Sequence, residues 1–179
     1  LLCGAGLAVY VGSRLVPAMR SREDSVFYAQ DFPVCAARWL GADPLPLRIF
    51  NQYGEGGYLA YRLSAHGDRV YIFGDAALMG DSLLNSYGDV ESVSPRWDSI
   101  VRAAGTDIVL FDTGAPLSNV LAHAPDWVEV YHDPHNVAFA LRDRVSSLHL
   151  AAQPNFVATG DTCTTLADTP PAQLNQSPG

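Results

Sequence analysis

A short apolar segment without polar alternation is the feature that most constrains this fold. Residues 107–111 are Asp-Ile-Val-Leu-Phe, a pattern typical of a strand that is buried on both faces. Such strands occur in parallel sheets that carry helices on each side. Apolar spacing predicts further strands at 47–51 and 70–73, and helices at 32–40, 58–63, 78–90, 95–104 and 116–123.

The last two predicted strands have a different pattern. Residues 127–131 and 137–141 alternate on either side of Asp133-Pro134, a dipeptide typical of turns, and this predicts a hairpin. Strands that alternate with helices and then end in a hairpin indicate an α/β fold. We therefore predict a layered domain with a mainly parallel sheet and a C-terminal antiparallel hairpin.

Both ends of the chain differ from this central part. Residues 1–13 are uncharged until Arg14, but a membrane span needs about 20 apolar residues. Basic residues follow this run instead of preceding it, which does not match a signal peptide. We expect residues 1–20 to be the end of a transmembrane helix whose start lies upstream; the alternative is a buried N-terminal helix. Residues 21–144 then form a soluble α/β domain, and residues 145–179, rich in Pro and Thr, form a flexible tail.

Charge and cysteine content exclude some classes of function. The formal net charge of -8 disfavours nucleic-acid binding, because phosphate neutralisation needs clustered cations and the 11 basic residues are scattered. Cys3, Cys35 and Cys163 are widely spaced, so neither a disulfide framework nor a zinc site is indicated. Cys35 is interpreted as a small core residue. We predict no catalytic residue, metal or cofactor.

Asp112-Thr113-Gly114, at the end of the apolar run, is the sharpest motif. The same tripeptide is the signature of aspartic proteases, in which two copies supply two carboxylates that share one proton. This chain has one copy, so protease activity requires a homodimer. Such dimeric enzymes are nearly all β, whereas helices are predicted on both sides of this strand. The alternative is a strand end that leads into the next helix.

Two further motifs have an ordinary structural explanation. His132 and His135 could be metal ligands, but they flank the predicted Asp133-Pro134 turn and have no further ligands nearby in sequence. Glycines within residues 54–57 follow a strand, where backbone N–H groups can approach an anion. Their spacing matches neither common phosphate-binding motif, so a tight strand-to-helix turn is the alternative.

Open α/β sheets bind ligands at the carboxyl ends of their parallel strands. In this chain those ends and the adjoining glycine turn define one crevice as the candidate ligand-binding site. Its residues are Asn51, Gly56, Gly57, Asp75 and Asp112.

Residues 50–63, Phe-Asn-Gln-Tyr-Gly-Glu-Gly-Gly-Tyr-Leu-Ala-Tyr-Arg-Leu, carry a family resemblance. They resemble the F-N-x-Y-x-x-G-G-Y-L-x-W/Y-R-L stretch that follows the last membrane helix of many bacterial polytopic proteins. Those proteins are described as glycosyltransferase-like, of the lipid-linked-sugar (GT-C, mannosyltransferase-like) class. Later segments match in order, so that the resemblance covers residues 48–142. Phe73-Gly74-Asp75 departs from it, because relatives often carry Asp-Gly-Arg there, and no role of that Arg is carried over.

The resemblance implies a non-catalytic C-terminal soluble domain of a polytopic membrane protein. In such enzymes the catalytic acidic residues belong to an early extracytoplasmic loop between membrane helices. The implied location is the cell membrane, with the domain on the extracytoplasmic side and a polyprenyl-linked sugar or a glycan acceptor as partner. Arg14, Arg20 and Arg22 favour a cytoplasmic flank instead. The alternatives are a stand-alone sugar- or nucleotide-binding module and, more remotely, the dimeric aspartic protease.

Overall fold

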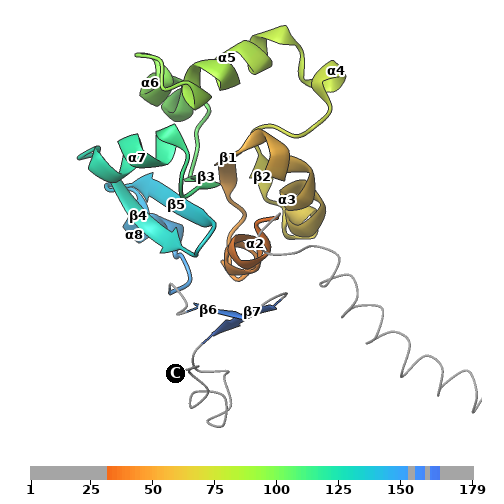
Figure 1. The fold of residues 1–179 in the computed structure, drawn as a ribbon, viewed down its shortest axis with the longest axis vertical. Helices are drawn as coiled ribbons and strands as arrows, with labels where there is room; N and C mark the ends of the chain where they lie inside the picture. Colours follow the sequence, from red (N-terminus) through yellow and green to blue (C-terminus); the bar gives the residue numbers. More distant parts are fainter. Residues whose placement is uncertain (1–31, 153–155, 160–161, 166–179) are drawn as a thin grey trace, which may run out of the picture.

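The computed structural model describes residues 32–152, 156–159 and 162–165, which form a mixed α/β fold (Figure 1). This confirms the α/β class that the sequence predicts. The strands are β1 (Arg48–Asn51), β2 (Arg69–Val70), β3 (Ile108–Asp112), β4 (Trp127–His132), β5 (Asn136–Leu141), β6 (Phe156–Thr159) and β7 (Thr162–Thr165). The helices are α2 (Val34–Leu40), α3 (Gly56–Leu63), α4 (Ala76–Met79), α5 (Asp81–Glu91), α6 (Trp97–Ala103), α7 (Pro116–His123) and α8 (Val145–Leu148), with the 3-10 turns η1 (Tyr53–Glu55) and η2 (Ser64–His66).

The central sheet has five strands in the order β2-β1-β3-β5-β4. β1 pairs in parallel with β2 and β3, whereas β5 pairs antiparallel with β3 and β4. The sheet is therefore mixed, with as many antiparallel as parallel pairs, and the prediction of a mainly parallel sheet was wrong because the hairpin adds two antiparallel pairs to only two parallel ones. The predicted hairpin is confirmed: Trp127 of β4 lies opposite Leu141 of β5, and the turn falls at Asp133-Pro134.

The order of the strands creates a topological switch point, which is the place where connections leave two neighbouring strands in opposite directions. From β1 the chain moves outward to β2, and it then returns past β1 to form β3 on the other side. The chain leaves the carboxyl end of β1 towards β2, and it leaves the carboxyl end of β3 towards the β4–β5 hairpin on the opposite side, so the two connections diverge there. Open sheets of this kind place ligand-binding crevices at such a point.

Two clusters of apolar side chains pack on the sheet, and neighbouring strand residues alternate between them. Ile49 belongs to the first cluster and Phe50 to the second. Helices α2 and α3 contribute to the first cluster, and α5, α6 and α7 contribute to the second (Figure 1). Residues 108–111 are at most 2% exposed, which confirms the buried strand predicted from their apolar run.

β2 is shorter than its sequence predicts. A strand was expected at 70–73, but only Arg69–Val70 pairs with β1. The Asn51 side chain accepts hydrogen bonds from the backbone N–H groups of Tyr71 (3.0 Å) and Ile72 (3.3 Å). A side chain thus takes over the role of a strand partner, and the ladder ends there.

The ends of the domain lie partly within the described residues. The predicted transmembrane segment at 1–20 lies outside them, and none of the helices that are described has the length and hydropathy to span a bilayer. Within 145–179, predicted as a flexible tail, the structure describes α8 and the antiparallel pair β6–β7. Leu148 is buried in the first core cluster, and the Trp39 indole donates a hydrogen bond to the Ala151 carbonyl (3.0 Å). Packing therefore continues beyond residue 144.

Cys35 on α2 packs against the first core cluster, in agreement with its interpretation as a core residue. It is also disulfide-bonded. The sequence indicated no disulfide framework, and the bonding of Cys35 was not predicted. A bridge between residues that are distant along the chain leaves no short cysteine motif from which it could be recognised.

Candidate functional site

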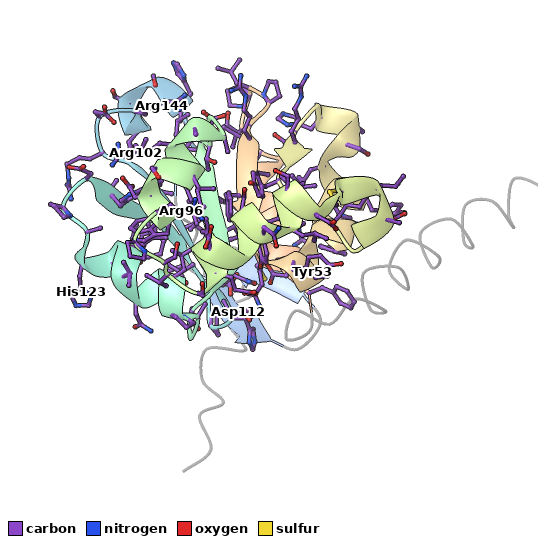
Figure 2. All side chains as sticks on the ribbon, turned by 90° about the horizontal axis from the view of Figure 1, so that it is seen from above. Tyr53, Arg96, Arg102, Asp112, His123 and Arg144 are labelled. Atoms are coloured by element: carbon purple, nitrogen blue, oxygen red, sulfur yellow. The ribbon has the colours of Figure 1, made fainter. Side chains whose placement is uncertain are left out.

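Two side chains pair across the switch point between β1 and β3. Gln52 directly follows β1, and Asp112 is the last residue of β3. Gln52 Nε2 donates a hydrogen bond to Asp112 Oδ2 (2.6 Å), and the Asp112 backbone N–H donates to Gln52 Oε1 (3.0 Å). The sheet brings them together because neighbouring parallel strands end at the same edge. Figure 2 shows Asp112 and Tyr53, the residue after Gln52, at one edge of the domain.

A crevice of about 270 Å³ opens beside this pair. It is lined by one amide, two carboxylates and a mainly apolar segment, which are Gln52, Asp112, Glu91, Phe111 and residues 114–117. None of these lining side chains is basic, so the local potential is negative. Within the described part of the chain, the second N–H of Gln52 Nε2 and the Oδ1 atom of Asp112 have no hydrogen-bond partner. The crevice therefore offers one free donor and one free acceptor side by side.

Tyr87 connects helix α5 to this edge of the sheet. Its hydroxyl oxygen accepts a hydrogen bond from the Tyr53 backbone N–H (2.8 Å), and the hydroxyl donates to Glu91 Oε1 (3.2 Å). Burial, together with the adjacent Glu91 carboxylate, raises the pKa of Tyr87, which therefore stays protonated and able to donate at neutral pH. This contact fixes Glu91 at the crevice.

Glu55, close to the Gln52–Asp112 pair, is a buried carboxyl group that is 8% exposed. Its Oε1 atom accepts a hydrogen bond from Asn136 Nδ2 (2.6 Å), whereas its buried Oε2 atom has no partner among the described residues. Burial raises the pKa of Glu55 to about 7; the Asn136 hydrogen bond opposes this shift, and the charges of Asp112 and Asp133 add to it. Glu55 consequently changes its protonation state near neutral pH.

The turn between β4 and β5 positions the partner of Glu55. Asp133 Oδ1 accepts hydrogen bonds from the backbone N–H groups of His135 and Asn136, both at 2.8 Å. Its Oδ2 atom accepts the Tyr131 hydroxyl (2.5 Å), and burial together with this carboxylate raises the pKa of Tyr131. The turn predicted at Asp133-Pro134 is therefore a hydrogen-bonded unit in which the buried Asp133 holds Asn136 against Glu55.

The structure also shows where the two histidines considered as metal ligands and the Asp112-Thr113-Gly114 motif lie. In the described residues, no three His, Cys, Asp or Glu side chains are grouped so that they could hold a metal ion, and His132 lies 3.4 Å from Glu129 instead. Asp112 ends β3, and its carbonyl accepts a hydrogen bond from the Ser118 hydroxyl of α7 (2.8 Å). The Asp112-Thr113 segment therefore joins a strand to the next helix.

Among the predicted site residues, Asn51 and Gly56 have structural contacts. Asn51 is fully buried, and besides accepting from the backbone after β2 it donates to the carbonyls of Gln52 (2.9 Å) and Ile72 (2.8 Å). A Cβ atom on Gly56 would lie 1.9 Å from the Ile72 carbonyl oxygen. The glycine is therefore required by close packing of α3 against the segment after β2. Neither residue lines the crevice.

The remaining predicted residues divide between surface and crevice. Gly57 is exposed, and a Cβ atom there would meet nothing within 4 Å. Asp75 is exposed, and its Oδ1 atom accepts a hydrogen bond from the Leu78 backbone N–H (3.3 Å) at the start of α4. Only Asp112 of the five predicted residues therefore lines the crevice.

Sequence reasoning missed Gln52, Glu55, Glu91 and Asn136. Gln52 could have been found, because it directly follows the predicted strand end at residue 51 and the same rule about carboxyl ends applies to it. The burial of Glu55 and its contact with Asn136 join segments that are 81 residues apart, and no local pattern signals such a contact.

Comparison with known proteins adds no relative: no protein-family model, curated protein or solved structure matches this chain.

Proposed function

We propose that this chain is the non-catalytic, extracytoplasmic C-terminal domain of a polytopic membrane protein of the lipid-linked-sugar glycosyltransferase type. We further propose that its crevice binds hydroxyl groups of a sugar, such as those of a glycan acceptor. In this proposal the domain is layered, with helices on both faces of the sheet, and it follows the end of a transmembrane helix. The resemblance of residues 50–63 supports the membrane context, and the lining of the crevice carries the choice of ligand.

The polar groups of the crevice match sugar hydroxyls. A hydroxyl both donates and accepts hydrogen bonds, so neighbouring hydroxyls can use the free donor of Gln52 and the free acceptor of Asp112 together. Ala115, which is partly exposed, and Pro116, which is exposed, give an apolar surface on which the C–H side of a sugar ring can pack. This combination of a few polar groups with apolar surface is common in small-molecule sites.

The charge of the crevice argues against a nucleotide. A phosphate group there would face the carboxylates of Asp112 and Glu91, and the lining contains no cation to offset the repulsion. Neutral sugars avoid this penalty. Of the two candidate ligands, a sugar and a nucleotide, the crevice therefore favours the sugar.

The geometry of Glu55 supports a binding role without catalysis. A carboxyl group with a pKa of about 7 is often a catalytic acid or base. Such a group must reach the reacting atoms, but Glu55 is buried, bonded to Asn136 and absent from the crevice lining. Its raised pKa follows from the packing of the domain.

The disulfide of Cys35 supports the extracytoplasmic side. Disulfide bonds persist in oxidising compartments outside the cytoplasm and are rare within it. The disulfide therefore favours the opposite side of the membrane from the basic residues after the apolar run, which favour a cytoplasmic flank.

Chemical-shift mapping by NMR on the ¹⁵N-labelled chain tests the proposal. Mannose, glucose, galactose and N-acetylglucosamine are titrated separately, with AMP as the nucleotide comparison. We expect at least one sugar to shift the amide signals of Gln52, Asp112 and residues 114–117, and AMP to leave them unchanged. Shifts at these positions with AMP alone, or no shift with any sugar at millimolar concentration, would contradict it.

A further inference from the structure

A second cavity, of about 450 Å³, lies at the opposite end of the sheet from the crevice beside Gln52 and Asp112. Its lining comes from the start of β1, from β2 with the residue that follows it, and from the segment before β3. These residues are Arg48, Ile49, Arg69, Val70, Tyr71, Ala104 and Thr106. Arg144, which pairs with Asp107 just before β3, is labelled in Figure 2 at the edge of the domain away from Asp112. The two cavities are therefore separate.

Two arginines stand side by side in this second cavity. Arg48 and Arg69 are register partners on the parallel strands β1 and β2. Within the described part of the chain, neither guanidinium group has an ion pair or a hydrogen bond. Two neighbouring positive charges repel each other, and in a chain with 19 acidic residues a pair without acidic partners is unexpected.

The acidic residues beside this cavity, Asp107 and Asp68, are engaged in other contacts. Asp107 Oδ2 accepts the Arg48 backbone N–H (2.9 Å), and its Oδ1 accepts the Arg144 guanidinium (2.7 Å). Asp68, which precedes Arg69, accepts the Leu47 backbone N–H (2.6 Å) through one oxygen. Its other oxygen lies 2.9 Å from the His66 ring. These carboxylates therefore hold the backbone at the ends of the strands and leave the two guanidinium groups unpaired.

The backbone near Arg48 makes room for its guanidinium group. A Cβ atom on Gly105 would lie 2.4 Å from Arg48 Nη1, and Gly105 adopts a φ of +66° that favours glycine. Tyr71 brings a third donor: its ring stacks on Phe50 with centroids 4.1 Å apart, and its hydroxyl has no hydrogen bond within the described residues. A hydroxyl and two guanidinium groups thus line one cavity.

From this arrangement we infer that the cavity between Arg48, Arg69 and Tyr71 binds a phosphate-type oxyanion. Guanidinium groups form paired, charge-assisted hydrogen bonds with phosphate oxygens, and an anion between two of them removes their mutual repulsion. The cavity volume of about 450 Å³ is within the range of small-molecule sites, roughly 300–1,000 Å³. This site is independent of the proposed sugar crevice, from which it differs in position, lining and charge.

The phosphate group could belong to a soluble ion or to the head group of an anionic lipid, and the test separates these sources. Binding of inorganic pyrophosphate to the full chain is measured by calorimetry at low salt. Co-sedimentation is measured with vesicles of phosphatidylcholine alone and with vesicles that contain phosphatidylglycerol. The Arg48→Gln/Arg69→Gln double variant and the Arg69→Lys variant are compared with Arg96→Gln, which removes a charge at the other end of α6. Thermal unfolding confirms that each variant is folded.

We expect the double variant to bind at least tenfold more weakly than the wild type, while Arg96→Gln stays within twofold and Arg69→Lys lies between them. Pyrophosphate binding without a preference for phosphatidylglycerol identifies a soluble anion as the ligand. A preference for phosphatidylglycerol that the double variant loses identifies a lipid head group. The inference is overturned if neither probe binds, or if the double variant binds as tightly as Arg96→Gln. The Gln52→Ala variant should leave this binding unchanged, so failure here is distinguishable from failure of the sugar proposal.

Discussion

Replacing Glu55 with Gln should change how the stability of the domain depends on pH. The pKa of Glu55 is 4.5 for an unperturbed carboxyl and about 7 in the folded domain. Between these values the folded state keeps a proton that the unfolded state has released, so this group lowers the free energy of unfolding as pH rises. Below pH 4.5 both states are protonated and the penalty is absent. Above pH 7 it is complete, at about 3 kcal/mol for a shift of this size.

Glu55→Gln removes this charge and keeps a carbonyl oxygen for Asn136 Nδ2. The new amide places N–H groups where Oε2 has no partner, which costs about 1–3 kcal/mol at every pH. The difference in unfolding free energy between the variant and the wild type should therefore rise by about 3 kcal/mol from pH 4 to pH 8, whatever the constant offset. Urea unfolding across this range, followed by tryptophan fluorescence, measures the difference.

A matched control is Glu129→Gln, which neutralises an exposed carboxyl on β4. Taking differences from the wild type removes the contribution of the other carboxylates, which both variants retain apart from the one replaced. If the difference between Glu55→Gln and the wild type is constant from pH 4 to pH 8, or equals that of Glu129→Gln, the reasoning about Glu55 is refuted.

Four further changes have clear expected outcomes. Gly56→Ala should lower the free energy of unfolding by roughly 1–3 kcal/mol, because its Cβ would lie 1.9 Å from the Ile72 carbonyl oxygen. Gly57→Ala, one residue further into α3, has open space and should stabilise by roughly 0.5 kcal/mol; equal urea midpoints for the two variants would disprove this. Asn51→Ala should lower the free energy of unfolding by about 2–4 kcal/mol in the same assay, since it removes four hydrogen bonds to buried or partly buried backbone groups; a change below 1 kcal/mol would count against that role. Reduction with dithiothreitol should destabilise the wild type by about 2–4 kcal/mol and leave Cys35→Ser unaffected, and an unchanged melting temperature on reduction would exclude a stabilising disulfide.

Local sequence patterns were sufficient to predict those helices and strands whose burial is visible in their own apolar spacing. Helix α7 has the predicted bounds of 116–123, because Pro116 suits a first turn and its apolar residues recur at helical spacing. β3 was recognised from its apolar run, since a strand covered on both faces needs no polar alternation. β2 was overestimated, because Asn51, a residue of another strand, satisfies the backbone where the ladder was expected to continue.

The candidate site was less predictable than the fold. The rule that ligands bind at the carboxyl ends of parallel strands identified Asp112, and it applies equally to Gln52. It also selected Asn51, whose amide is fully used by the backbone, because the rule does not say which side chains are satisfied internally. The raised pKa of Glu55 depends on burial that exists only after the sheet has formed, and the hydrogen bond from Asn136, 81 residues away, opposes that shift.

The binding of sugar hydroxyls at the crevice is tested most directly by one dissociation constant and its dependence on Gln52. The best sugar from the NMR panel is titrated into the wild type, into Gln52→Ala and into Asn85→Ala, which removes an exposed amide from α5. We predict millimolar or tighter binding that Gln52→Ala weakens at least tenfold, corresponding to about 1.4 kcal/mol, and that Asn85→Ala leaves within twofold. Equal affinities for the three proteins, or no saturable binding by the wild type, would contradict a sugar site at this edge of the sheet.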